Sequence, residues 1–330
     1  MKTKIVYTLT SSEKDIYLEQ ALISAYSCRL HNPDAEILLI IDRDTDNTLV
    51  GKRAKINEYI TKKVVIDCPT EYTQVERSRY LKTTVRQQIK GVFIFIDTDT
   101  IVTDSLEAAD DFEGSIGVVP EFHCTLEHYP GTKGLKEDAK RDGWEYDSTD
   151  IYNYNSGVII CKDDEEGNKF YQMWHECWRE RLQNRGGHHD QPPMAKADHL
   201  LNHPIKVLDG IWNCQIIMNG IYFLPKAKIV HYYGSSLLTN KRTFSYAFED
   251  ASILYEIKEL GFIPEKTKEM ILSAKELINP RSHLVVADEI DLLNSQVFRV
   301  VKNLFFKHKV FFGALNTLLR WGGAIKAELK

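Results

Sequence analysis

Two carboxylates, Asp97 and Asp99, follow directly on a short apolar run at residues 93–96. Such a run is typical of a buried strand, and ligands of open α/β sheets bind outside the carboxyl ends of strands. Because the chain leaves the pleat there, the two side chains need not point to opposite faces and can share one divalent cation. Carboxylate oxygens suit Mg²⁺ or Mn²⁺, and an ion held in this way can bridge a diphosphate and neutralise the charge that grows on it as it leaves.

The same eight residues, 93–100, also fit the hhhhDxDxT pattern of haloacid-dehalogenase-like phosphatases. In that family the first Asp, here Asp97, is a nucleophile and the second is an acid or base. The phosphatase motif usually follows the first strand and needs a downstream acidic pair after another apolar strand. Asp163 and Asp164 follow such a run, but they stand at a predicted helix start. The phosphatase is therefore kept as an alternative interpretation.

Apolar runs that alternate with helical stretches define the elements around these residues. Strands are expected at residues 4–10, 36–42, 64–68, 92–97, 115–121, 155–162 and 223–234. A helix is expected after the first strand, with Ser11 or Ser12 as its cap, and another from about 164 to 183, where apolar side chains form one stripe. This alternation predicts an α/β fold, a Rossmann-like and mostly parallel sheet with helices on both faces.

The remaining segments differ in composition from this core. Residues 122–150 are polar and show no sustained period, so we expect a long loop over the site. After residue 240 the pattern is helical, which divides the chain into a catalytic domain at 1–240 and a helical C-terminal region at 241–330. The six cysteines form no CxxC pair, as expected for reduced and buried thiols.

Charge is distributed unevenly along the chain. The net charge of −5 argues against nucleic acid as a partner. Residues 296–330 contain seven Lys or Arg and one acid, a net charge of +6, which leaves −11 for residues 1–295. Within 296–322 the basic and apolar side chains fall on opposite sides of a helix, which predicts an interfacial helix at an anionic membrane. Packing on its own domain and contact with a partner protein are the alternatives.

The ends of the chain bear on its location. The N-terminus lacks the apolar core of a signal peptide, and no run of 18 apolar residues occurs. We therefore expect a cytoplasmic protein, peripheral at the inner face of the membrane if the basic tail binds there.

Five segments, in order, resemble glycosyltransferase family 8, which includes glycogenin and bacterial lipopolysaccharide sugar transferases. They are YTLTSS (7–12), IFIDTDTIVTDSL (94–106), YNSGVII (154–160), HHDQ (188–191) and IVHYYG (229–234). The resemblance covers roughly residues 4–236 and implies a GT-A fold, a Mn²⁺ or Mg²⁺ ion and usually a UDP-sugar donor. It also implies hexose transfer to a saccharide or lipid-linked acceptor, with retention of anomeric configuration.

The resemblance assigns roles to individual residues. The metal ligands would be Asp97, Asp99 and His231. Asp190 would hold a hydroxyl of the transferred sugar, and Gln191 would steady positive charge at the anomeric carbon. The donor nucleotide and sugar would be bound by Thr8, Leu9, Thr10, Ser11, Arg79, Lys82, Thr98, Asn155, Ser156, Gly157 and Gly234. Several of these residues also have ordinary structural explanations, such as helix capping for Ser11 and Asp190.

One departure from the family and two further alternatives matter. The family commonly has Lys-Pro-Trp soon after the metal histidine, and residues 231–242 lack it; Lys241 or Arg242 could substitute only if the loop folds back. A sugar-nucleotide nucleotidylyltransferase shares this architecture but usually opens with a glycine-rich loop, and residues 4–15 contain no glycine. The other alternative is a non-catalytic carbohydrate-binding protein of the same fold, against which the intact carboxylates and histidine argue.

Overall fold

The computed structural model describes residues 1–330 except 217–218, 234–243, 283–288, 290–291, 294 and 329–330. The chain divides into two compact units, residues 1–281 and 282–330. Both β-sheets belong to the first unit.

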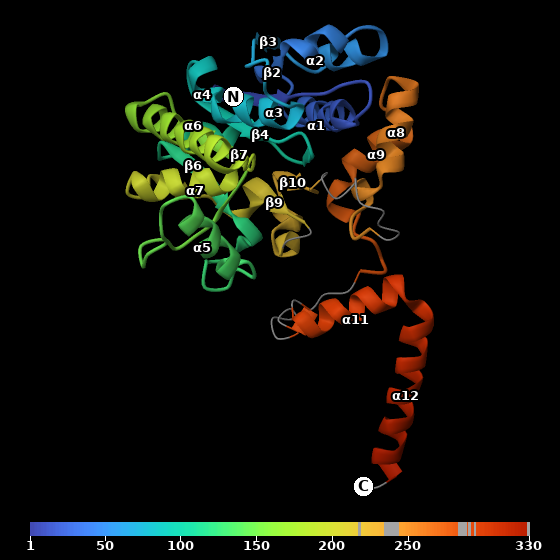
Figure 1. Ribbon diagram of the computed structural model, residues 1–330. Helices are drawn as coiled ribbons and strands as arrows, with labels where there is room; N and C mark the ends of the chain where they lie inside the picture. The colour runs from blue at the N-terminus through green and yellow to red at the C-terminus, as the bar shows by residue number, and fades with distance from the viewer. Residues whose placement is uncertain (217–218, 234–243, 283–288, 290–291, 294, 329–330) are drawn as a thin grey trace. The chain divides into compact units, whose positions relative to one another are not determined.

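A seven-stranded sheet in the order β3-β2-β1-β4-β7-β6-β8 forms the centre of the first unit (Figure 1). Its strands are β1 (Lys4–Leu9), β2 (Ile37–Asp42), β3 (Lys62–Ile66), β4 (Phe93–Ile96), β6 (Ile116–Pro120), β7 (Tyr154–Cys161) and β8 (Ile205–Val207). Neighbouring strands are parallel, except that β7 runs antiparallel to both β4 and β6. The predicted α/β class with a mostly parallel sheet is confirmed.

Helices cover both faces of this sheet because successive side chains of a strand point to opposite sides. On β1, Ile5 and Tyr7 join one apolar core, whereas Val6 joins the other. Helix α1 (Tyr17–His31) packs into the first core. The second core is covered by α3 (Gln74–Thr83), α4 (Val85–Gln88), α6 (Glu165–Arg185) and α7 (Gln191–Leu200). The helix predicted at 164–183 is α6.

A second, three-stranded sheet connects two distant parts of the sequence. It contains β5 (Thr100–Val102), β10 (Ile229–His231) and β9 (Cys214–Gln215), in the order β5-β10-β9. β10 runs antiparallel to β5, with His231 opposite Thr100. Since Thr100 directly follows Asp99, this pairing brings the predicted histidine ligand to the predicted carboxylates.

Three predictions about the elements of the first unit are wrong. Helix α1 begins at Tyr17 rather than at Ser11 or Ser12, because Asp15 accepts hydrogen bonds from both serines and holds them in a preceding loop. Residues 122–150 contain helix α5 (Thr132–Arg141), a mostly charged helix. The strand predicted at 223–234 is limited to β10, since a 3-10 turn occupies Leu224–Lys226 and 234 is not among the described residues.

Smaller helices complete the first unit. Helix α2 (Arg43–Thr48) follows β2, and α8 (Ala251–Leu260) and α9 (Glu265–Leu272) contact α1. The helical pattern after residue 240 is thus found, while a domain boundary at that residue stays a prediction.

The second unit holds α11 (Gln296–Lys307) and α12 (Lys309–Glu328). The single helix predicted at 296–322 is therefore two helices, and the break falls at His308, whose backbone (φ −129°, ψ 56°) is not helical. Among the described residues, every helix is too short or too polar to cross a membrane.

Candidate active site

A cavity of about 590 Å³ lies at the carboxyl ends of β1 and β4 and at the start of β7. Fourteen of the residues that the sequence assigned to metal, donor or catalysis line it: Thr8, Leu9, Thr10, Arg79, Lys82, Asp97, Thr98, Asp99, Asn155, Ser156, Gly157, Asp190, Gln191 and His231. Ser11 is not among the lining residues, and Gly234, Lys241 and Arg242 fall outside the described part of the chain. The fold therefore gathers residues from six separate segments around one cavity.

Asp97, Asp99 and His231 form a compact cluster in this cavity. One ligand atom from each lies within 4.8 Å of the others. The His231 Nε2 atom is 3.3 Å from a carboxylate oxygen of Asp99. Two carboxylates and one imidazole are a donor set that fits Mn²⁺ or Mg²⁺, so these residues suit the ion that the resemblance implies.

Asn213 and Tyr233 hold the ring of His231 in position. Its Nδ1 atom lies 2.9 Å from Oδ1 of Asn213, and its ring stacks on Tyr233 with centroids 4.3 Å apart. Burial lowers the pKa of His231, but the negative charge of Asp99 outweighs it and raises the pKa overall. An Nδ1–H donated to Asn213 leaves Nε2 as the ligand atom, which is how metal-binding imidazoles are usually oriented.

A chain of ion pairs runs from Asp97 to Arg79. Lys82 is only 3% exposed, and its Nζ lies 2.9 Å from Asp97 and 3.2 Å from Asp190. Arg79 Nε lies 3.0 Å from the other oxygen of Asp190. Ser156 donates a hydrogen bond of 2.7 Å to the Asp190 oxygen that faces Lys82. Burial raises the pKa of the Asp190 carboxyl, but Lys82 and Arg79 hold it well below its usual range. These two cations therefore favour the ionised form of Asp190.

Asp190 precedes α7 without capping it, since its side chain makes ion pairs instead. The helix-cap explanation for this residue is thus wrong.

The loop between β1 and α1 is organised by Asp15, which the sequence analysis missed. Asp15 accepts hydrogen bonds from Ser11, from Ser12 and from the Gln74 amide at 2.7 Å. Although burial raises the pKa of Asp15, these hydrogen bonds lower it overall. Asp15 and Gln74 both line the cavity beside Thr10, so the loop and helix α3 are fixed to each other at its rim.

Glu121 is a second residue that was missed. It is 6% exposed and accepts hydrogen bonds of 2.6 Å from the amides of Asn155 and Gln191, and one from the Tyr233 hydroxyl. Burial raises the pKa of the Glu121 carboxyl. The side-chain oxygen of Asn155 also accepts a hydrogen bond from the Asn213 amide. Asn155 therefore links Glu121 to Asn213, the residue that contacts the ring of His231.

Gly157 offers a direct test of the histidine position. A Cβ atom at residue 157 would lie 2.8 Å from both His231 Nδ1 and Asn155 Oδ1, well inside van der Waals contact. We expect Gly157→Ala to displace the imidazole and to weaken Mn²⁺ binding by about tenfold or more, measured by titration calorimetry. Gly134→Ala is the matched control, since a Cβ there meets open space. Unchanged Mn²⁺ affinity in Gly157→Ala would show that His231 is not a ligand.

The acidic pair required by the phosphatase alternative lies at the wrong end of the sheet. Because β7 is antiparallel to β4, Cys161 pairs with Phe93 at the start of β4. Asp163 accepts a hydrogen bond from the Gly91 backbone, and Asp164 caps α6. Both carboxylates are therefore separated from Asp97 by the length of β4, and the phosphatase finds no support.

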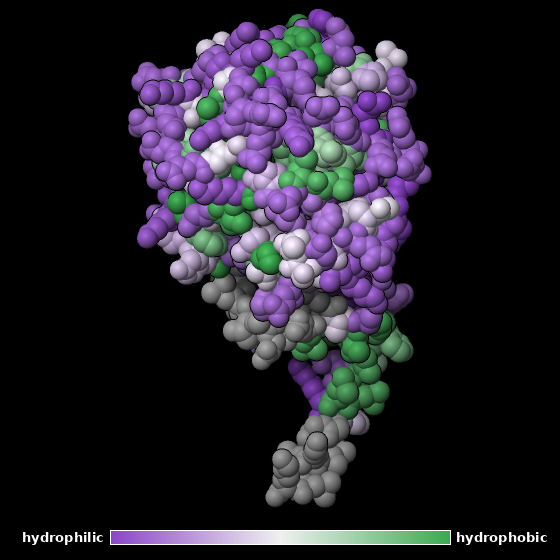
Figure 2. Space-filling model, turned by 90° about the vertical axis from the view of Figure 1, so that its left-hand side faces the viewer, coloured by the Kyte–Doolittle hydropathy of each residue, from purple (hydrophilic) through white to green (hydrophobic). Residues whose placement is uncertain are grey.

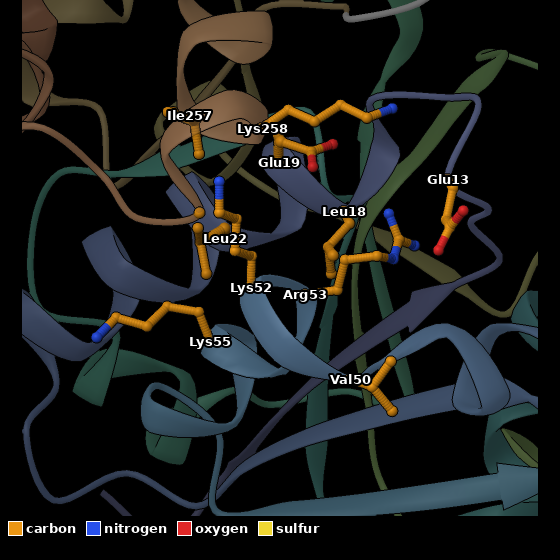
Figure 3. Close-up of a pocket in the computed structure, with 11 residues that line it drawn as sticks. Glu13, Leu18, Glu19, Leu22, Val50, Lys52, Arg53, Lys55, Ile257 and Lys258 are labelled. Atoms are coloured by element: carbon orange, nitrogen blue, oxygen red, sulfur yellow. The ribbon is translucent and has the colours of Figure 1, made fainter.

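A second cavity, of about 270 Å³, lies on the opposite side of α1. Helix α1 turns Tyr17 and Gln20 to the first cavity and Glu19 to the second. Figure 3 shows Glu19 beside the side chain of Lys258 there, and Arg53 lines the same cavity. Arg53 donates a hydrogen bond of 3.0 Å to Ser11, so Ser11 contacts this basic side of the loop rather than the first cavity.

Comparison with known proteins supports the fold but not a close relative. No family model and no curated protein matches the chain. The solved galactosyltransferase LgtC, in complex with donor and acceptor sugar analogues, matches 81% of this chain and 99% of its own at 15% identity and a TM-score of 0.51. The bifunctional glycosyltransferase WbbM matches 70% of this chain and 46% of its own at 12% identity and a TM-score of 0.50. Mouse xyloside xylosyltransferase 1 matches 71% of this chain and 99% of its own, at 16% identity and a TM-score of 0.46.

The matches to LgtC and WbbM define the class of fold. The chain has the GT-A fold of glycosyltransferases, as the resemblance to glycosyltransferase family 8 implies.

Proposed function

We propose that this chain is a metal-dependent glycosyltransferase that moves a hexose from a UDP-sugar to a saccharide or lipid-linked acceptor with retention of configuration. The observation that carries the proposal is the meeting of Asp97, Asp99 and His231 in one cavity at the carboxyl end of the sheet. Cations and a buried carboxylate line the same cavity, as a diphosphate and a sugar require. LgtC, a galactosyltransferase of the same fold, was solved with donor and acceptor sugar analogues.

The charged residues have distinct roles in this proposal. Asp97, Asp99 and His231 would hold Mn²⁺ or Mg²⁺, which when bound neutralises charge on the leaving diphosphate. Lys82 and Arg79 place positive charge beside the same region, and both are kept in position by Asp190. The loop at Thr8 to Thr10 lines the cavity beyond them and would receive the nucleotide base.

The reacting sugar would lie between the cluster and the start of α7. Asp190 is ionised and would accept a hydrogen bond from a sugar hydroxyl, while Gln191, fixed through Glu121, would face the anomeric carbon. The acceptor hydroxyl would attack C1 on the face that the diphosphate leaves, as the bond from C1 to the diphosphate oxygen breaks. UDP would take the electron pair of that bond and the proton of the acceptor hydroxyl. Preorganised polar groups of this kind stabilise charge that appears only in the transition state.

A panel of nucleotide sugars tests the proposal. The full-length protein with Mn²⁺ is expected to release UDP from one or a few UDP-sugars, slowly by hydrolysis and faster once a suitable acceptor is added. EDTA should stop the release. If no nucleotide sugar is consumed but phosphate monoesters are hydrolysed, and Asp97→Asn abolishes that hydrolysis, the phosphatase would be the better explanation.

We also propose that the second compact unit binds an anionic membrane surface and so brings the enzyme to a lipid-linked acceptor at the cytoplasmic face. Large apolar side chains of α11 and α12 are exposed, among them Phe306 (64%), Phe311 (63%) and Leu319 (66%). The same two helices carry six Lys or Arg and one acid, Glu328. Green surface near the lower end of Figure 2 shows the apolar side chains of this segment. Apolar area combined with basic charge is what interfacial helices use.

Vesicle co-sedimentation tests this second proposal. The full chain should sediment with anionic vesicles at low salt and dissociate as salt is raised, because the attraction is screened. A variant ending at Arg281 should stay in solution, and Phe311→Ser should bind less than the full chain. Equal failure of the full chain and the shortened variant to bind would leave the tail without a membrane role.

A further inference from the structure

A cluster of two histidines and an aspartate lies apart from the donor cavity, where the loop after α5 meets the end of α7. Asp150, His199 and His203 each place one ligand atom within 4.8 Å of the others. None of the three lines the cavity that holds Asp97. We infer that these residues bind a Zn²⁺ ion that fastens the loop to helix α7. This inference does not depend on the proposed function.

The two histidines approach Asp150 from the two sides of a tight turn. His199 lies in the last turn of α7, with its Nδ1 atom 3.1 Å from Asp150. The chain then reverses at Asn202 and His203, which both take left-handed backbone conformations with φ of 61° and 62°. Left-handed φ is uncommon for residues other than glycine, so two in succession mark a segment held in place by its contacts. The reversal returns the second imidazole toward the first.

A second aspartate orients the His203 ring. Asp198 lies 3.0 Å from His203 Nδ1, and it also accepts a hydrogen bond of 3.1 Å from the Ile205 backbone. With Nδ1–H donated to this carboxylate, Nε2 carries the lone pair. Nε2 lies 2.8 Å from the hydroxyl of Thr149, the residue before Asp150. That hydroxyl donates its hydrogen to Asp147, so a bound ion would replace its contact with Nε2. A carboxylate behind a histidine is the usual outer support of a zinc ligand.

The donor set selects the ion. Two imidazole nitrogens and one carboxylate oxygen suit Zn²⁺, with a water in the fourth position, whereas Mg²⁺ and Mn²⁺ prefer oxygen ligands. The Asp150 side chain is 5% exposed, and those of His199 and His203 are 23% and 26% exposed. An ion from solution can therefore reach the histidines while the carboxylate is shielded.

The position of the cluster indicates what the ion would do. Asp150 precedes the start of β7, and α7 begins at Gln191, beside the donor cavity. The Trp144 ring packs 5.2 Å from the His199 ring, so the loop already rests on α7. An ion shared by both elements would restrain this loop against the helix that begins beside the donor cavity.

Zinc counting in the full-length protein tests the inference. The protein is stripped with a chelator, dialysed against a zinc buffer and analysed for bound metal. Wild type should retain one equivalent of Zn²⁺ that is lost in His199→Gln, His203→Gln and Asp150→Asn. It should be retained in His231→Gln, which reports on the donor cluster, and in His128→Gln, an exposed control. Asp198→Asn should weaken zinc binding by roughly 10- to 100-fold, as expected for an outer support.

Two further measurements guard against variants that merely unfold. Far-UV circular dichroism of the metal-free proteins should be the same in wild type and variants, and Zn²⁺ should raise the melting temperature of wild type but not of His203→Gln. Co²⁺ in place of zinc should give a tetrahedral absorption spectrum only when the cluster is intact. Zinc retained equally by His199→Gln and wild type, or lost only in His231→Gln, would overturn the inference and leave a hydrogen-bonded cluster.

Discussion

Replacing Asp99 with Asn is expected to abolish sugar transfer while leaving the fold unchanged. The substitution removes one of two carboxylates from the cluster and also removes the charge that His231 Nε2 faces at 3.3 Å. Loss of a metal-assisted leaving group costs several kcal/mol of transition-state stabilisation, so turnover should fall about 1000-fold or more. The measurement is the rate of UDP release from the UDP-sugar that the panel identifies, at saturating Mn²⁺.

Asp104→Asn is the matched control, because Asp104 is an exposed aspartate a few residues along the chain. It should retain wild-type turnover, and both variants should melt near the wild-type temperature. Asp99→Asn with undiminished turnover would contradict the assignment of this residue as a ligand.

Replacing Asp190 with Asn is expected to reduce turnover by about 100-fold with a much smaller effect on UDP affinity. Asp190 is ionised because Lys82 and Arg79 lie at 3.2 Å and 3.0 Å from its two oxygens. The neutral amide accepts a weaker hydrogen bond from a sugar hydroxyl and holds both cations less firmly. UDP lacks the sugar, so an effect on turnover that exceeds the effect on UDP affinity identifies a contact made to the transferred group.

The control for this second variant lies at the far end of β4. Asp163→Asn changes a carboxylate that contacts Gly91 and Arg86, away from the cavity, and should leave transfer unchanged. If Asp190→Asn lowers UDP affinity as steeply as turnover, Asp190 belongs to the nucleotide pocket or supports the fold.

The chemical groups of the site can be predicted from the sequence more completely than the elements that position them. Asp97 and Asp99 were predicted from a strand that ends in two acids, and the apolar run that precedes them is fully buried. His231 was placed with them through the family resemblance, whereas its physical cause is the pairing of β10 with β5. Strands of three residues carry too little periodic pattern to be paired from sequence.

The supporting residues could not be predicted for a different reason. Asp15 and Glu121 act through hydrogen bonds to side chains distant in sequence, among them Gln74 and Gln191. No local spacing marks such residues, because only the folded chain brings their partners to them. The predicted start of α1 is too early for the same reason. Ser11 and Ser12 resemble helix caps in the sequence, but in the folded chain they donate hydrogen bonds to Asp15.

In the C-terminal segment, residues 296–328, the sequence predicted the helices but not the break between them. Its amphipathic pattern predicted one long helix, and the pattern itself is present in both α11 and α12. The break at His308 leaves each helix with its own apolar residues, which periodicity over the whole segment did not resolve. Helix content was thus predicted, while the position of the interruption was not.

The most direct test of the account is calorimetric titration of metal-stripped protein with UDP, with and without Mn²⁺. Two carboxylates and a diphosphate repel each other, so an ion between them is required for tight binding. We expect UDP to bind with Mn²⁺ present and to show little or no binding in EDTA, and Asp99→Asn should bind weakly in both conditions. Equal UDP affinity in Mn²⁺ and in EDTA would contradict the assignment of Asp97, Asp99 and His231 as the site of a catalytic metal ion.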